Sequence, residues 1–285
     1  HAQFIEGAAD YVQFYQNHEY FESLIRRGLE LAGRDGKVET ILDIGSGAGN
    51  SVIPLLDMYP QATIVASDLS LNLLAMLNEV IHKDYADRNI AVAHLNAEEL
   101  EFKEGSFDLI VGAAILHHLF HPDRTIEAAS RMLSEHGIAL FFEPMQNVNY
   151  MVRVFYRLLL KSPRSWLMSP LLRRYIKRRI RFFDDRVGTD KSDPKYLEMD
   201  DKWMFPTSYL KDLGEQVGFS RCIIEPIGDP LARVEAKMRV HMKGYRRDYE
   251  ALPRWFRKMV AEFDANLPPH MQNEFMGDAI VVFVK

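Results

Sequence analysis

The chain has 285 residues, of which 47% are hydrophobic and 26% charged, and its formal net charge is −5 at pH 7. This composition is typical of a globular protein with one large domain or two small ones, and it excludes a disordered chain, a fibrous chain and a disulfide scaffold. The single cysteine, Cys222, allows no disulfide within the chain, which favours a reducing compartment and a cytoplasmic location. The longest apolar runs fall far short of the about 20 residues that cross a membrane. The chain begins at His1 without a signal-peptide pattern, and a start other than Met indicates a trimmed N-terminus, a tag remnant or an excised domain.

A helix is predicted first, over residues 8–32, because apolar side chains recur there at helical spacing before Gly33. Short apolar runs without internal proline then alternate with helical stretches, which is typical of buried parallel strands and their crossover helices. The predicted strands are Val38–Ile44, Ala62–Ser67, Ile90–Leu95, Phe107–Ala113 and Ile138–Phe142. The predicted helices between them are Ser51–Met58, Asn72–Asp84 and Arg124–Ser134, whereas Glu98–Leu100 is too short to assign.

The regular alternation stops after Phe142. Residues 145–204 form an insertion that is basic and aromatic at first and acidic later. Thr207 or Ser208 is expected to cap a helix over Tyr209–Val217. Two more strands are predicted at Arg221–Ile227 and Ala279–Val284, with a helical insertion over residues 229–276 that breaks at Gly244 and Pro253.

These elements predict an α/β fold: a Rossmann-like, doubly wound, seven-stranded, mostly parallel sheet with helical insertions. The core is expected over residues 38–144, and the C-terminal part of the sheet over 205–285. In such a fold, ligands bind at the carboxyl ends of the strands.

A glycine-rich turn follows the first predicted strand, in the stretch from Asp43 through Gly45, Ser46 and Gly47 to Gly49. Glycines let the backbone turn sharply and let a ligand lie against the main chain. Asn50 stands where the dinucleotide fingerprint has its third glycine, which disfavours a nicotinamide cofactor. Asp68 ends the next strand, where a carboxylate accepts hydrogen bonds from both ribose hydroxyls or, as an alternative, caps the helix that follows.

Five segments in order resemble the class I S-adenosylmethionine-dependent methyltransferases, most of all the ubiquinone/menaquinone-biosynthesis type. The resemblance covers about residues 38–144. Its segments are Leu42–Gly49, Ala66–Ser70, Asn96–Phe102, Gly105–Val111 and Ile115–Leu119.

The resemblance implies S-adenosyl-L-methionine as cofactor and assigns roles to particular residues. Asp43 and the turn Gly45, Ser46, Gly47 and Gly49 would hold the methionine portion, with Ala113 along its tail. Asp68 would bind the ribose, Leu69 would flank the adenine, and Asn96 and Ala97 would contact its edge. The family usually has Asp where this chain has Asn96, so we expect a small loss of cofactor affinity. Residues 1–37 would form an N-terminal helical lid, where Tyr15 could touch the methionine end or simply pack against the sheet.

Catalytic candidates stand at the carboxyl ends of the fourth and fifth strands. His117 and His118 follow the fourth strand, and Glu143 ends the fifth. By analogy with relatives we predict His118 with Glu143 as the acid/base pair, the alternative being that the histidines only shape the pocket. The spacing of His117, His118 and His121 matches no metal pattern, so no metal is predicted.

The first part of the insertion concentrates positive charge. Residues 151–181 contain ten Lys or Arg and no Asp or Glu, so the rest of the chain carries −15. Insertions at this place usually form the acceptor lid in the family, and the aromatic and Met side chains indicate an apolar acceptor. The basic residues either pair with the protein's own acids or meet a phosphate-bearing, lipid-like or carrier-bound acceptor or a membrane surface, and nucleic acid is disfavoured.

The sequence thus predicts a methyltransferase acting on a small or lipid-like acceptor, with O-methylation through a His general base. Methylation at carbon or nitrogen, a cofactor-bound cyclase and a binding or interaction domain that has lost transfer are the alternatives.

Overall fold

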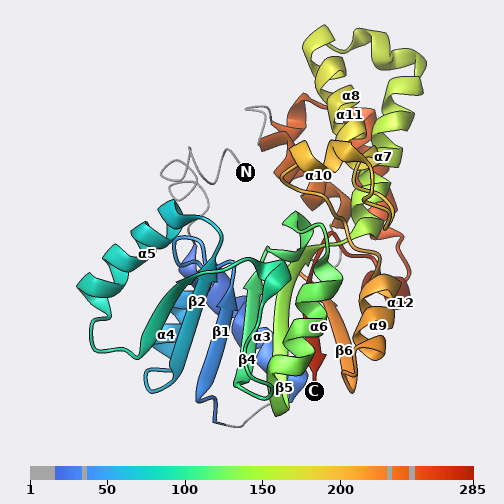
Figure 1. Cartoon of the computed structure of the whole chain (residues 1–285). Coiled ribbons are helices and arrows are strands. Elements are labelled where there is room, and N and C mark those ends of the chain that lie inside the picture. The colour runs from blue at the N-terminus through green and yellow to red at the C-terminus, as the bar shows by residue number, and fades with distance from the viewer. Residues whose placement is uncertain (1–16, 34–36, 230–232, 244–247) are drawn as a thin grey trace.

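The computed structural model describes residues 17–33, 37–229, 233–243 and 248–285, and these form one central sheet with helices on both faces (Figure 1). Seven strands lie within the described residues, in the order β3-β2-β1-β4-β5-β7-β6, and only β7 runs antiparallel to its neighbours. The predicted fold class is therefore confirmed. The strands are β1 (Thr40–Ile44), β2 (Thr63–Asp68), β3 (Ile90–His94), β4 (Phe107–Ala113), β5 (Leu133–Pro144), β6 (Arg221–Pro226) and β7 (Asp278–Val284).

Some of the helices begin at a side-chain cap or at a proline. The side chain of Ser70 accepts from Leu73 N at the start of α5, and Pro122 occupies the first turn of α6, where its missing N–H costs nothing. The helices are α3 (His18–Ala32), α4 (Val52–Met58), α5 (Leu71–Asp84), α6 (Pro122–Met132), α7 (Gln146–Lys161), α8 (Pro170–Asp184), α9 (Thr207–Gln216), α10 (Arg233–Lys243), α11 (Arg254–Ala265) and α12 (Pro269–Gln272).

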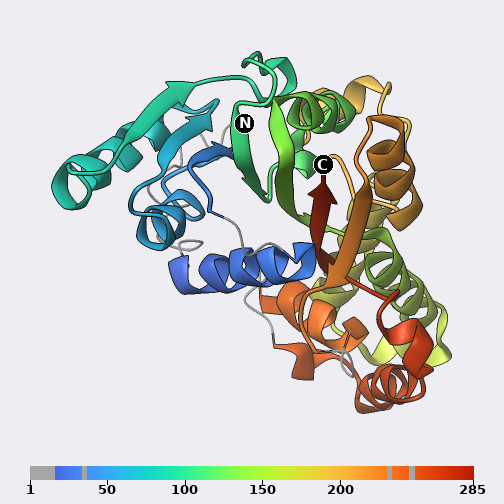
Figure 2. The same ribbon diagram turned by 90° about the horizontal axis from the view of Figure 1, so that it is seen from below.

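Two apolar cores sandwich the sheet. On one face α3, α4 and α5 pack against it, and α3 crosses β5 and β7 (Figure 2). On the other face α6 and α9 pack around Phe141, Phe205 and Phe283. Because the parallel strands are covered on both faces, their sequences are continuous apolar runs without an alternation of polar residues. These runs made the strands predictable from the sequence.

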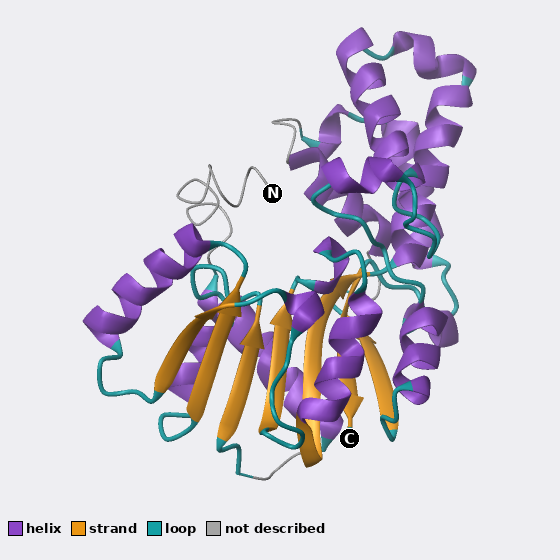
Figure 3. Ribbon diagram, viewed as in Figure 1, coloured by secondary structure: helices purple, strands orange, loops and turns teal. Residues whose placement is uncertain are grey.

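The two predicted insertions pack on each other in a third apolar core. Helices α7 and α8 from the first contact α10 and α11 from the second through buried residues such as Phe155, Phe183 and Phe256. This helical layer stands beyond the carboxyl ends of the parallel strands (Figure 3). Segments about 100 residues apart in sequence thus form one body next to the predicted ligand edge.

Two local predictions were wrong. Strand β5 begins at Leu133, inside the stretch predicted as helix, and its register against β4 shifts between Phe107 and Leu109. Neither Thr207 nor Ser208 caps α9, which starts at Thr207 after Pro206 and has no side-chain cap. Of the N-terminal segment predicted as a lid, α3 packs on the sheet, and residues 1–16, with Tyr15, lie outside the described residues. Among the described residues, no helix is long and apolar enough to cross a bilayer.

Candidate active site

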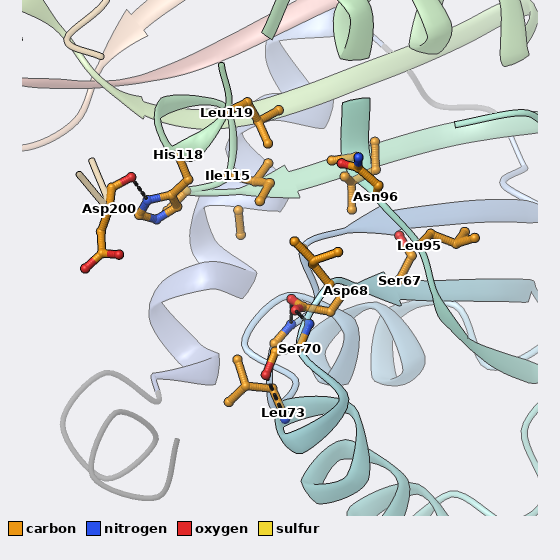
Figure 4. Close-up of a pocket in the computed structure, with 17 residues that line it drawn as sticks. Ser67, Asp68, Ser70, Leu73, Leu95, Asn96, Ile115, His118, Leu119 and Asp200 are labelled. Carbon is orange, nitrogen blue, oxygen red and sulfur yellow. Dashed lines mark hydrogen bonds between the residues drawn. The ribbon is translucent and has the colours of Figure 1, made fainter. Parts of the chain in front are cut away.

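A cavity opens where β1, β2 and β4 end. From β1 the chain first adds strands on the β2 side of the sheet and then, from β4 on, adds strands on the other side. Open α/β sheets bind ligands at the point where the strand order switches in this way. Figure 4 shows side chains from four loops converging on it. The cavity is lined by Ile44, Gly45, Gly47, Ser67, Asp68, Leu69, Ser70, Leu73, Leu95, Asn96, Ala97, Ala113, Ala114, Ile115, His118, Leu119 and Asp200.

The glycine turn forms the floor of this cavity. Gly47 has a φ of +53°, and a Cβ placed there would come no closer than 3.9 Å to another atom, so the space above it is open to a ligand. Gly49 has a φ of +111°, but a Cβ there would stand 2.9 Å from Ile53 and 3.2 Å from Leu77. Gly47 therefore serves ligand approach, whereas Gly49 serves the packing of the turn on α4 and α5.

Asn50, which replaces the third fingerprint glycine, has a structural partner. Its Oδ1 accepts from the backbone N of Asn17, the N-cap of α3, at 3.0 Å. Asn50, the residue that departs from the dinucleotide pattern, thus connects the start of α3 to the glycine turn.

Asp68, at the end of β2, binds the glycine turn by hydrogen bonds. Its Oδ2 accepts from Gly47 N at 2.9 Å and its Oδ1 from Ser70 N at 2.7 Å. Burial raises its pKa although these backbone hydrogen bonds oppose the shift. Each carboxylate oxygen has a second lone pair, so both can also accept from a ribose hydroxyl. The helix cap that the sequence left as an alternative for Asp68 is provided instead by Ser70.

Asp43 lies fully buried beneath the turn. Neither of its carboxylate oxygens has a hydrogen-bond partner of regular geometry in the described part of the chain. Burial raises its pKa to about 6, although the nearby hydroxyls of Ser46 and Ser51 lower it. The Asp43 carboxylate is therefore a buried negative charge with unsatisfied oxygens, and it lies below an open glycine turn. A cationic ligand above the turn would offset this charge.

The loops after β3 and β4 complete the walls. Asn96 caps the turn Ala97–Glu99, with its Oδ1 accepting from Glu98 N at 3.1 Å, so the second lone pair of that oxygen is the one available to an adenine amino group. Ala114, next to Ala113, is the single residue other than glycine with a positive φ among the described residues, at +58°. Such backbone conformations occur at ligand sites, where the surroundings hold them.

Glu143 organises the turn that carries the histidines, Leu116–His118. Its side chain is fully buried, and Oε1 accepts from Ile115 N at 3.0 Å and Leu116 N at 2.8 Å. Its Oε2 accepts from His117 N at 3.2 Å and from His117 Nδ1 at 2.7 Å. Burial alone would lower the pKa of His117, but the charge and hydrogen bond of Glu143, with Asp201 adding to them, raise it. The predicted pair of His118 with Glu143 is therefore not formed, because the carboxylate binds the neighbouring histidine.

His118 points into the cavity from the same turn. Its Nδ1 lies 3.1 Å from the carbonyl oxygen of Asp200, and since a carbonyl only accepts, Nδ1 carries the proton and Nε2 the lone pair (Figure 4). Burial and the adjacent His117 lower its pKa well below the usual value, so the ring is neutral at pH 7. One histidine is thus anchored and biased toward the charged form, whereas the other is neutral and lines the site.

The segment that holds His118 comes from the insertion, and no motif in the sequence indicated it. Lys202 is almost fully buried, and its Nζ donates to the carbonyls of His118 at 2.6 Å and Met199 at 2.9 Å, while its backbone N donates to His117 O at 2.7 Å. Asp201 Oδ1 lies 3.8 Å from His117 Nε2 and 3.5 Å from His118 Nδ1.

His117, His118 and Asp201 bring three potential metal ligands within 4.8 Å of one another. Both histidines already use Nδ1 as a donor, which leaves only their Nε2 atoms for a metal. The hydrogen bonds account for the cluster as a polar network, and we assign no metal to it.

The predicted site residues divide into two groups. Asp43, Ser46 and Gly49 support the cavity from below, and His117 and Glu143 from behind, without lining it. Asp200 lines the cavity although the sequence did not indicate it. The predicted residues that line it are Gly45, Gly47, Asp68, Leu69, Asn96, Ala97, Ala113 and His118.

Comparison with known proteins finds methyltransferases. A family described as a methyltransferase domain matches residues 41–137. The malonyl-[acyl-carrier protein] O-methyltransferase of Geobacter sulfurreducens is 32% identical over 143 residues, or 48% of this chain and 50% of the relative. The ubiquinone/menaquinone biosynthesis C-methyltransferase UbiE of Methylococcus capsulatus is 25% identical over 185 residues, or 65% of this chain and 68% of the relative.

Similarity in fold extends further than similarity in sequence. The solved structure of Haemonchus contortus phosphoethanolamine N-methyltransferase 2, in complex with phosphomonomethylethanolamine and S-adenosylhomocysteine, covers 98% of this chain and 57% of that chain, with a TM-score of 0.58 and 16% identity. The fold is that of the Rossmann-like methyltransferases. Residues 41–137 thus match a methyltransferase domain, and the chain is similar to class I S-adenosylmethionine-dependent methyltransferases, although it spans only half the length of the Geobacter relative.

The residues present fit the cofactor of this family. The open space over Gly47 admits the methionine portion, Asp68 offers two acceptor oxygens for the ribose, and the unsatisfied Asp43 carboxylate favours a cationic sulfonium above it. The predicted cofactor, S-adenosyl-L-methionine, is therefore retained.

Proposed function

We propose that the protein transfers a methyl group from S-adenosylmethionine to a hydroxyl oxygen of a small or lipid-like acceptor, with His118 as the proton acceptor. The observation that carries this proposal is the position of His118, which lines the cofactor cavity and keeps its lone pair on Nε2 because Nδ1 donates to the Asp200 carbonyl. A hydroxyl loses its proton as the new C–O bond forms, and an imidazole lone pair at the cavity wall can accept it, with a strength as a base that burial of the ring reduces.

The cofactor supplies the methyl group and a good leaving group when it is bound. The chain's residues orient it, since Asp68 holds the ribose and the glycine turn holds the methionine portion. Glu143 and His117 are positioning residues, because they hold the turn that presents His118. The Asp200 carbonyl fixes the ring tautomer, which keeps the lone pair on the nitrogen that accepts the proton.

The apolar nature of the acceptor is supported by the wall beside His118, which consists of Ile115 and Leu119. The helical layer of α7, α8, α10 and α11 stands at the same edge of the sheet, as an acceptor lid would. The half-buried Cys222 is a free thiol, which fits the reducing cytoplasm expected from the sequence.

A second acceptor class is favoured by the Geobacter relative, whose name specifies a malonyl group on an acyl-carrier protein. The free carboxyl group of a malonyl thioester is already an anion at neutral pH, so its methylation needs no base. The two classes therefore make opposite predictions for His118.

The test measures release of S-adenosylhomocysteine and transfer of labelled methyl to a hydroxylated long-chain lipid, a quinol and a malonyl carrier thioester. With a hydroxyl acceptor, His118→Ala should lower kcat about 10²- to 10⁴-fold and leave cofactor affinity unchanged. His270→Ala, at an exposed histidine of α12, is the matched control and should have no effect. Equal turnover of wild type and His118→Ala on every methylated acceptor would remove His118 from the reaction. Methyl label found only on carbon would overturn O-methylation, and an absence of transfer despite tight cofactor binding would favour the binding domain or cyclase.

A further inference from the structure

The turn between α7 and α8 exposes large apolar side chains at the end of the helical layer away from the sheet. We call residues 161–174 the insertion tip. Within it Trp166 is 72% exposed, Leu167 68% and Leu171 54%. Exposed single apolar residues are ordinary, but three in one short turn, one of them Trp, form the kind of patch that marks an interaction site.

Unpaired positive charge surrounds this patch. At the base of the insertion, Arg153 and Arg157 pair with Asp184. At the tip, by contrast, no ion pair within the described residues involves the basic side chains, which are Lys161, Arg164, Arg173 and Arg174. The expectation that the basic stripe pairs with the protein's own acids therefore holds at the base of the insertion and not at its tip.

A groove adjoins the apolar patch. It has a volume of about 400 Å³ and runs between the tip and the start of α11. Arg164 and Ser169 are polar members of its lining, and Leu167, Leu172 and Trp255 contribute apolar surface. A cation beside an apolar groove matches an anionic amphiphile, in which a charged head adjoins a hydrocarbon tail.

We propose that the insertion tip docks on an anionic lipid bilayer. Trp166 takes the interfacial position that amphipathic aromatic rings prefer, Leu167 and Leu171 enter the acyl boundary, and the surrounding cations meet lipid phosphates. Because residues 151–181 carry +10 and the rest of the chain −15, an anionic surface attracts the tip and repels the body. Docking by the tip leaves the ends of β1, β2 and β4, where the cavity opens, away from the surface (Figure 1).

The test is co-sedimentation of the full chain with vesicles of phosphatidylcholine alone or with about 30% phosphatidylglycerol added. We expect binding only to the anionic vesicles, weakened by raised salt. The pair Trp166→Glu and Leu167→Glu should lower binding about tenfold or more, and Arg173→Ala with Arg174→Ala about fivefold per charge removed.

Val240→Glu is the matched control for each Glu substitution at the tip taken singly, because Val240 is 62% exposed on α10, outside the tip, and the substitution likewise introduces one negative charge. Circular dichroism and cofactor affinity should be unchanged in all variants, which separates this proposal from the proposed function. Equal binding to both vesicle types, or an equal loss with Val240→Glu, would overturn the proposal. Loss of self-association or of an acidic protein partner in the tip variants, with vesicle binding unchanged, would show that the tip is a protein interface instead.

Discussion

Replacing Glu143 by Gln tests whether this buried carboxylate holds the histidine turn. The amide oxygen could still accept from Ile115 N and Leu116 N, but the amide NH₂ would then face two donors of His117, its backbone N and Nδ1. The variant loses a charge-assisted hydrogen bond and leaves buried N–H donors facing another donor. Each buried donor without an acceptor lowers the free energy of unfolding by about 1–3 kcal/mol. Breaking a buried ion pair costs about 3–5 kcal/mol in total, so we expect a loss of about 4 kcal/mol.

Chemical denaturation measures this loss, and thermal denaturation should show a melting temperature lower by about 10 °C. The pH dependence gives an independent check. Because the pKa of His117 is raised above the ordinary value of 6.5, its contribution to stability is complete below pH 6.5 and is lost as the pH rises through the raised value. In the variant, burial without the carboxylate should lower that pKa below 6.5, so stability should instead increase as the pH rises to about 6.5 and stay level above it.

The control is Glu127→Gln on the exposed face of α6, which should change stability by less than about 0.5 kcal/mol. A Glu143→Gln protein as stable as the wild type, with the same pH dependence, would refute the assignment of Glu143 as the anchor of the turn.

Further predictions concern the cofactor cradle. Asp68→Ala should weaken S-adenosylhomocysteine binding at least about 100-fold by calorimetry, since two ribose hydrogen bonds to a carboxylate are lost; because burial raises the pKa of Asp68, wild-type affinity should fall on acidification sooner than for an ordinary aspartate. Gly49→Ala should cost about 2–4 kcal/mol, through its φ of +111° and the 2.9 Å approach to Ile53, whereas Gly105→Ala, with a positive φ but no atom within 4 Å, should cost about 1 kcal/mol; similar losses in both would contradict the packing role. Asn96→Asp should tighten cofactor binding several-fold, because a carboxylate is the stronger acceptor toward an amino group, and unchanged affinity would show that this side chain does not contact the adenine.

The parts of the site that were predictable are those with a local signal. The turn from Gly45 to Gly49 and the carboxylate of Asp68 stand at strand ends, and buried strands are visible as apolar runs. The pairing of Glu143 was not predictable, because His117 and His118 are neighbours in one short turn, with ring centroids 4.0 Å apart, and sequence spacing does not say which of them binds the carboxylate of β5.

The contribution of the insertion was out of reach for a different reason. Asp200 and Lys202 meet the histidines across more than 80 residues of chain. No periodicity or motif marks a residue whose role depends on a contact made only in the folded protein. For the same reason the sequence indicated two separate insertions, whereas α7 and α10 share one apolar core.

The ammonium group of Lys202 connects the end of the insertion to the turn that carries the two histidines. It fastens the end of the insertion to the backbone of His118, so any displacement of that end moves the His118 ring with it. A force on the helices of the insertion therefore reaches the wall of the cavity through the Lys202 side chain and through the backbone hydrogen bonds of Lys202 and Trp203 to His117.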